Sequence, residues 1–98
     1  MPKIDELAKM LDALGHPLRL RLVSQLAGGE MYLNEIANRL GVSRALAKIH
    51  LKKLERANLV KSKVVLIEGE AKALRYYQLV DFDICISPST LAKEVEKA

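Results

Sequence analysis

The segment that constrains this fold most lies in the middle of the chain, at residues 33–60, with the sequence LNEIANRLGVSRALAKIHLKKLERANLV. Apolar residues recur there at helical spacing and predict two helices, the second running from Ser43 to Ala57. Between the helices, Gly41 predicts a tight turn, because glycine accepts a positive φ at no steric cost. Ala37 supplies a small side chain where the first helix faces the second. The segment is therefore expected to form a helix-turn-helix over residues 33–57 and to lead into a strand.

Positive charge is concentrated on the second of these helices and on the strand after it. The whole chain has a net charge of +4, whereas residues 43–63 alone, with seven basic residues and one acidic residue, have a net charge of +6. A basic second helix is typical of a helix-turn-helix that enters a DNA groove, where counterion release gives salt-dependent affinity. A solvated, lysine-rich helix face is the alternative interpretation, and the position of the charge within the motif favours DNA. The seven basic residues are Arg44, Lys48, Lys52, Lys53, Arg56, Lys61 and Lys63.

The sequences on either side predict the rest of a winged helix-turn-helix. Helical spacing, Pro17 at a first helical position and alternating apolar residues indicate the flanking helices and strands. The expected helices cover 3–14, 17–27, 33–40, 43–57 and 88–97, and the expected strands cover 31–32, 59–67 and 71–80. The chain is therefore expected to be one domain over residues 1–98, mainly α with a small antiparallel β-wing (α+β), in the order α-α-(β)-α-α-β-β-α.

Composition and motif content exclude several classes of protein. No apolar run approaches the roughly 20 residues that a membrane helix requires, and no N-terminal segment has the order of a signal peptide. The single cysteine, Cys85, forms no internal disulfide and fits a reducing cytoplasm. No nucleophile–base pair, phosphate-binding glycine loop or paired carboxylate motif is visible, so neither an enzyme nor a cofactor is expected. We therefore expect a soluble, cytoplasmic protein whose small aliphatic core favours dimerisation.

Several motifs, taken in order, resemble the winged-helix repressors of the ArsR family. LGHPLRLRLVSQL is similar to the Leu-x-x-Pro-x-Arg opening of the family's second helix, and EIANRLGVS matches as well. AKIHLKKLERANLV is similar to Val-x-x-His-Leu-x-x-Leu-x-x-Ala-Gly-Leu-Val, and RYYQL to the end of the second wing strand. The resemblance covers about residues 11–80. It implies a homodimer that binds a palindromic double-stranded DNA operator, with the first and last helices forming the dimer interface.

The resemblance also implies which side chains meet DNA and which meet the second subunit. The helix from Ser43 to Ala57 enters the major groove, where Arg44 pairs with guanine for about 1–3 kcal/mol of discrimination. Phosphate contacts from Lys52 and Lys53 position the protein without specifying a sequence. The implied DNA-binding residues are Ser43, Arg44, Ala45, Lys48, Ile49, Lys52, Lys53, Lys61, Lys63 and Arg75. The implied dimer residues are Ile4, Leu7, Leu11, Leu91 and Val95, in helices over 1–14 and 87–97.

Two residues of the DNA-facing helix have a competing structural role. Ser43 is expected to cap the helix N-terminus, a role worth about 1 kcal/mol, and to contact phosphate in addition. Ile49 is unusual on a DNA-facing surface, and either contacts a thymine methyl group or is partly buried. On the opposite side of the helix, Ala47, Leu51 and Leu54 are expected to be core residues.

The sequence predicts no metal site. His50 and His16 are expected to be hydrogen-bonded structural residues, the second at a helix start, and Arg19 to form an ion pair or to contact phosphate. The stretch MYLNEIANRL lacks the cysteines of arsenic-sensing relatives, and SPSTLAKEVEKA lacks the histidines of zinc-sensing ones. Because zinc requires three or four N or S ligands, no metal sensing is expected.

The wing departs from the family pattern and leaves a second function open. Family wings are short with a basic tip, whereas here VVLI precedes the acidic tip Glu68-Gly69-Glu70. Acidic residues repel phosphate, so we expect backbone contacts nearer the base of the wing. The candidates there are Lys61, Lys63, Lys72 and Arg75. The apolar stretch supports the alternative function, a protein–protein interaction module within a transcription or processing complex.

Overall fold

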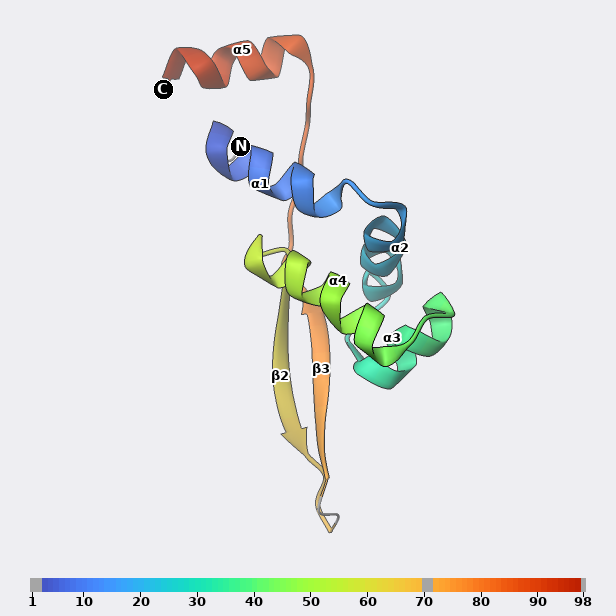
Figure 1. The fold of residues 1–98 in the computed structure, drawn as a ribbon. Helices are drawn as coiled ribbons and strands as arrows, with labels where there is room; N and C mark the ends of the chain where they lie inside the picture. Colours follow the sequence, from blue (N-terminus) through green and yellow to red (C-terminus); the bar gives the residue numbers. More distant parts are fainter. Residues whose placement is uncertain (1–2, 70–71, 98) are drawn as a thin grey trace.

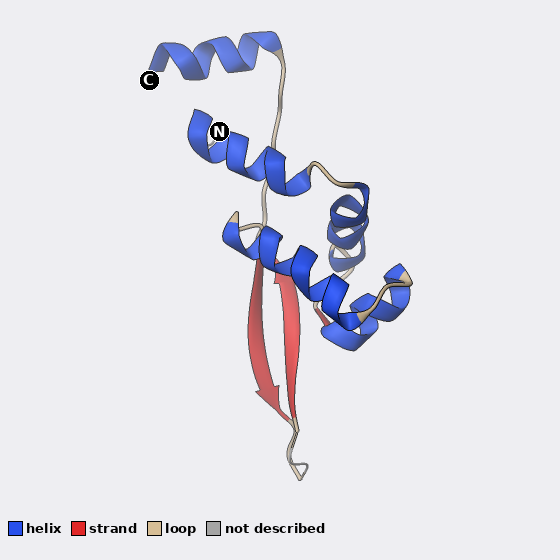
Figure 2. Cartoon of the chain, viewed as in Figure 1, coloured by secondary structure: helices blue, strands red, loops and turns tan. Residues whose placement is uncertain are grey.

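The computed structural model describes residues 3–69 and 72–97, with side chains described up to Lys93. Its elements follow the expected order, with five helices and a small sheet (Figure 1; Figure 2). The helices are α1 (Ile4–Leu14), α2 (Pro17–Leu26), α3 (Leu33–Leu40), α4 (Arg44–Arg56) and α5 (Pro88–Lys97). The strands are β1 (Met31–Tyr32), β2 (Val60–Leu66) and β3 (Ala73–Leu79).

The helix-turn-helix forms as its local signals predict. Gly41 ends α3 in the left-handed conformation at φ 66°, and its N–H bonds back to Ala37 and Asn38. Ser43 caps α4 through its hydroxyl, which accepts a hydrogen bond from the Leu46 N–H at 3.1 Å. Ala37 is buried, as predicted for a small residue on the inner side of α3, and α3 packs against α4. Local chemistry therefore fixes both the turn and the start of α4.

The wing is a hairpin of β2 and β3, and β1 adds a third strand at its base. All pairings are antiparallel, in the order β1-β3-β2, with Ser62 opposite Tyr77 and Met31 opposite the same Tyr77. Both wing strands are shorter than the expected 59–67 and 71–80. Leu59 does not join β2, because its N–H bonds to the Leu54 carbonyl and completes the end of α4.

The core is aliphatic, as the composition predicts, and includes one buried tyrosine. Side chains of the first four helices and of the sheet base form one cluster with Tyr77 of β3. The largest side chains that are almost fully buried are Leu7, Leu22, Ile36, Leu51, Leu54, Leu59 and Tyr77. Because α4 contributes to this core along one whole side, its rotation about its own axis is fixed.

The molecule is elongated, at 56 × 25 × 21 Å, with the wing at one end and α1 and α5 at the other (Figure 1). After β3 the chain runs in extended form over 80–87, past the side of α1, and turns into α5. Ser87 and Thr90 cap α5 reciprocally through their side chains. No helix in the described residues is long and apolar enough to cross a membrane.

The left-handed backbone conformation of Gly41, which would strain any residue with a Cβ, gives the first prediction. Gly41→Ala places a Cβ at φ 66°, and we expect it to lower the free energy of unfolding by about 1–2 kcal/mol. Gly28→Ala is the matched control, because its Cβ meets its nearest atom at an ordinary 3.6 Å and its φ is not positive. Urea unfolding monitored by circular dichroism measures both variants. Equal stability of the two would contradict the requirement for glycine in this turn.

Candidate nucleic-acid interface

One face of α4 is buried, and a different face presents exposed basic side chains. Ala47, Leu51 and Leu54 are fully buried, as predicted from the sequence. Arg44 and Lys48, one helical turn apart, are exposed on a different side, and Lys52 continues the row by another turn. We call Arg44, Lys48 and Lys52 the cationic row.

The cationic row lies beside the wing strand β3, across two shallow hollows. Arg44 and Lys48 line the first hollow together with Arg75 of β3, and Lys48 and Lys52 line the second with the same Arg75. Arg75 also donates a hydrogen bond to Ser62 Oγ at 3.1 Å, which ties its guanidinium to the face of the hairpin that lies toward α4. Helix α4 and the wing therefore present four basic side chains, together with the acidic Glu55, to one groove that the two hollows form.

The start of α3 also contributes to this groove, a contribution that the sequence analysis missed. Asn34 and Leu33 line the first hollow beside Arg44. The pairing of β1 with β3 brings them there, since α3 starts directly after β1. A two-residue strand gives too weak a sequence signal for this pairing to be predicted.

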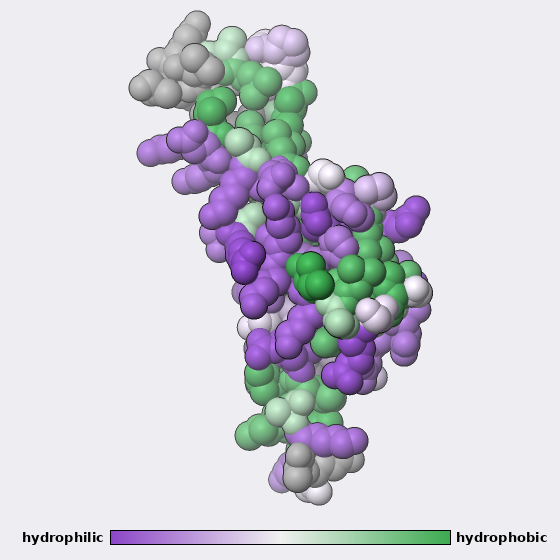
Figure 3. All heavy atoms as spheres, viewed as in Figure 1, coloured by the Kyte–Doolittle hydropathy of each residue, from purple (hydrophilic) through white to green (hydrophobic). Residues whose placement is uncertain are grey.

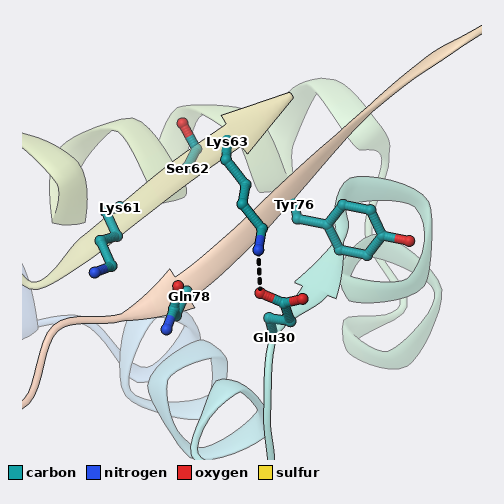
Figure 4. Close-up of a pocket in the computed structure, with 6 residues that line it drawn as sticks. All are labelled: Glu30, Lys61, Ser62, Lys63, Tyr76 and Gln78. Carbon is teal, nitrogen blue, oxygen red and sulfur yellow. Dashed lines mark ion pairs between the residues drawn. The ribbon is translucent and has the colours of Figure 1, made fainter. Parts of the chain in front are cut away.

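Two predicted wing contacts lie on the other face of the sheet. Lys61 and Lys63 point away from Ser62, as Figure 4 shows, and surround a pocket with Tyr76 and Gln78. Lys63 forms an ion pair with Glu30 at 3.1 Å. Successive side chains on a strand point to opposite faces, so Lys61 and Lys63 are separated from Arg75 by the thickness of the sheet.

Lys53 is also turned away from the groove. Its Nζ forms an ion pair at 2.8 Å with Asp12 of α1. The hydrogen bond and the positive charge of Lys53 lower the pKa of the Asp12 carboxyl below its usual value. Lys53 therefore connects α4 to α1, on the side of the molecule away from the wing.

The remaining candidates on α4 are open to solvent. Ile49 is 64% exposed, so the interpretation that it is partly buried is wrong within the part of the chain that the structure describes. Ala45 is exposed near the first turn, and Ser43 is exposed while its hydroxyl caps the helix. Figure 3 shows mainly hydrophilic residues over α4, with a hydrophobic patch among them, and hydrophobic residues over much of the wing below.

The five predicted dimer residues differ in how exposed they are in the structure. Leu11 is 40% exposed, and Ile4 and Leu91 are half-buried, on the paired helices α1 and α5. Leu7 is 2% exposed, because its own protomer already covers it, which leaves it little surface to offer a second subunit. The side chain of Val95 lies outside the described residues.

The histidines have the structural roles that the sequence predicts. His16 accepts a hydrogen bond from the Leu18 N–H at the start of α2, and His50 is buried and bonded to Arg19. Arg19 forms no ion pair among the described residues, and its phosphate contact stays a prediction. Its guanidinium donates to the Ala13 carbonyl and to His50, because the end of α1 lies directly beside it. Among the described residues, no three His, Cys, Asp or Glu side chains lie together as a metal site would require.

Comparison with known proteins agrees with this geometry. A family described as a helix-turn-helix domain matches residues 14–63. An uncharacterised HTH-type transcriptional regulator from Methanocaldococcus jannaschii is 35% identical over 94 residues, which cover 96% of this chain and 97% of the relative.

Solved structures share the winged fold. A homodimeric winged helix-turn-helix DNA-binding domain from Mycobacterium bovis, described as a possible ArsR-family regulator, has a TM-score of 0.66 at 29% identity. The match covers 78% of this chain and 65% of that one, just under two thirds. The transcriptional repressor BigR from Xylella fastidiosa has a TM-score of 0.65 at 25% identity, over 95% of this chain and 79% of its own. This chain belongs to the winged helix-turn-helix transcriptional regulators of the ArsR type, a family of regulators rather than enzymes.

Proposed function

We propose that this regulator is a homodimeric repressor that inserts α4 into the major groove of a palindromic operator. The observation that carries the proposal is the groove in which the cationic row of α4 lies beside Arg75 of β3. A helix-turn-helix places the first residues of its second helix against base edges, and flanking basic residues hold the phosphates. The cationic row and Arg75 have the positions that this arrangement needs.

Within this proposal the candidate residues divide by direction. Ser43, Arg44, Ala45, Lys48 and Ile49 are assigned to the base edges, and Lys52 and Arg75 to phosphates. The exposed Ile49 side chain suits a thymine methyl group, an apolar contact in the major groove. Lys53, Lys61 and Lys63 face elsewhere, so we assign them to the long-range attraction of DNA and not to contacts.

The second subunit is proposed to bind along α1 and α5. Both helices lie at the end of the molecule opposite the wing (Figure 1), where Leu11 is 40% and Ile86 is 46% exposed. A two-fold dimer through this end leaves both α4 helices free. Two such helices in successive major grooves read half-sites about 34 Å apart, hence a palindrome.

The assignment of contacts by direction gives a matched pair of variants. Lys48→Ala and Lys61→Ala each remove one exposed positive charge, from the groove and from the far face of the wing respectively. We expect Lys48→Ala to weaken operator binding about tenfold and Lys61→Ala less than about twofold. Fluorescence anisotropy with a duplex selected from a random pool measures both. Equal losses would contradict the proposed docking face, and no duplex binding even at low salt would overturn the DNA-binding function.

The dimer surface is tested by two leucines of similar exposure. Leu11 on α1 is 40% exposed and Leu20 on α2 is 54% exposed. We expect Leu11→Asp to produce a monomer at micromolar concentration, because a charge buried in an apolar interface has no partner. Leu20→Asp should leave the dimer intact. Size-exclusion chromatography with light scattering distinguishes the two, and a monomeric unsubstituted protein would refute the dimer itself.

A second candidate function, contact with another protein, is favoured by the outer half of the wing. Leu66 is 80%, Val64 53% and Val65 37% exposed, on both faces of the hairpin. Aliphatic surface of this kind is uncommon on a protein that binds only phosphate and bases. Under this function, affinity pull-downs after nuclease treatment should recover a protein partner. We expect Leu66→Ser to lose this partner and Lys48→Ala to retain it. Loss with Lys48→Ala instead would assign the partner to the DNA.

A further inference from the structure

The two histidines of the chain meet where α1, α2 and α4 join. His16 precedes α2, and His50 lies in α4 directly after Ile49, the last of the residues assigned to base edges. Their ring centroids are 4.8 Å apart, at an interplanar angle of 50°. Arg19 of α2 lies against the same cluster through its contact with His50. We call His16, Arg19 and His50 the histidine junction.

Both imidazoles in this junction must accept a hydrogen bond at Nδ1. His16 Nδ1 accepts from the Leu18 N–H at 3.0 Å and so caps α2. His50 Nδ1 is 3.0 Å from Arg19 Nη1, and a guanidinium has donors but no acceptor. Each ring is therefore neutral in this arrangement, with its proton on Nε2.

A proton added to either ring removes one of these bonds. Protonated His50 becomes a donor at Nδ1 and places a positive charge beside the Arg19 guanidinium. Protonated His16 can no longer accept from the Leu18 N–H, so α2 loses its cap. Charging both rings adds repulsion between them at 4.8 Å between centroids.

The surroundings of His50 oppose its protonation. Burial lowers its pKa below the usual value of 6.5, and the charges of His16 and Arg19 lower it further. The charge of Arg19 also acts on Asp12 of α1, but this carboxylate is already paired with Lys53 of α4. Protonation of the ring therefore takes place beside the positive charge of Arg19, and beside a second positive charge once His16 is also protonated.

The histidine junction connects the proposed dimerisation helix α1 to the DNA-facing helix α4. Arg19 Nε donates to the Ala13 carbonyl near the end of α1, while Nη1 of the same guanidinium donates to His50 of α4. Helix α1 carries the proposed dimer surface and α4 carries the cationic row. The Arg19 guanidinium therefore links the DNA-facing helix to the dimerisation helix, in addition to the Lys53–Asp12 ion pair.

We propose that the histidine junction is a proton-sensitive coupling, which holds α4 against α1 when both imidazoles are neutral and loosens when they take up protons. Its output, a loss of operator affinity in mild acid, rests on the proposed DNA-binding function. A general rise in positive charge with falling pH would tighten binding to phosphates instead. The two explanations therefore predict opposite signs.

The expected pH dependence follows from the lowered pKa of His50. The unfolded chain takes up the proton near pH 6.5, before the folded chain does. Folding stability is therefore fully present above that pH and decreases as the pH falls toward the folded pKa. Asp12 does not titrate in this window, because its pKa lies below 3.8.

Paired asparagine substitutions test the junction without removing its hydrogen bonds. The side-chain oxygen of asparagine occupies nearly the position of Nδ1, accepts a hydrogen bond and does not titrate, and asparagine is a good N-cap. The double variant His16→Asn/His50→Asn contains no histidine, since the chain has 2. Its urea unfolding is compared with that of the unsubstituted protein between pH 7.5 and 5.5.

We expect the folding equilibrium constant of the unsubstituted protein to fall about fivefold over this pH range, and that of the double variant to stay constant. The Leu18 amide and Arg19 Nε–H signals in NMR spectra should shift with the imidazole signals. Equal pH dependence of stability in both proteins would contradict the proposed role of the histidine junction. So would Leu18 and Arg19 N–H signals that do not change as the imidazoles titrate.

Operator affinity over the same pH range tests the output. We expect it to weaken about fivefold or more in the unsubstituted protein, and to stay constant or tighten in the double variant. A pH-dependent stability with unchanged affinity would overturn the coupling to DNA. An absence of DNA binding at every pH would refute the proposed function instead, and the unfolding and NMR results would still decide whether the junction exists.

Discussion

The buried side of α4 is the constraint on which the rest of the structure depends. Ala47, Leu51 and Leu54 have no exposed surface, and α4 contacts α1, α2, α3 and β2. Each buried leucine stabilises the fold by about 2–3 kcal/mol, so rotation of α4 about its axis is strongly opposed. The cationic row, lying on a different side of the same helix, therefore has one direction in space. Hydrophobic burial thus orients the charges that the proposed function uses.

The sequence was most informative where the structure depends on neighbouring residues. The left-handed turn at Gly41, the Ser43 cap, and the positive φ of 60° at Asn58 are local events, and each was predictable from residue type. Contacts between distant segments were not predictable. Arg19 meets His50 and Asp12 meets Lys53 only because the helices pack in one particular way.

The sequence of the wing contains a weak signal for which face of the sheet each side chain occupies. Alternation in phase with the buried Val60 and Tyr77 would have placed Ser62 and Arg75 toward the core, and Lys61 and Lys63 on the opposite face. The continuous apolar run after Lys63 hides this period, because it offers no polar residue to mark a face. The face that a lysine occupies then depends on the register with β3, which sequence periodicity alone does not determine.

The base and the outer half of the wing are held differently. Tyr77 lies in the core, where burial, and then the charge of Glu55, raise the pKa of its hydroxyl. Arg75 is two residues away on the same face, so a buried side chain fixes the direction of an exposed cation. Beyond Arg75, no core residue anchors the hairpin among the described residues, and Val64 and Leu66 are exposed. Precise placement at the base suits contacts with a rigid groove, whereas the aliphatic outer half suits a surface that gains stability when another molecule covers it.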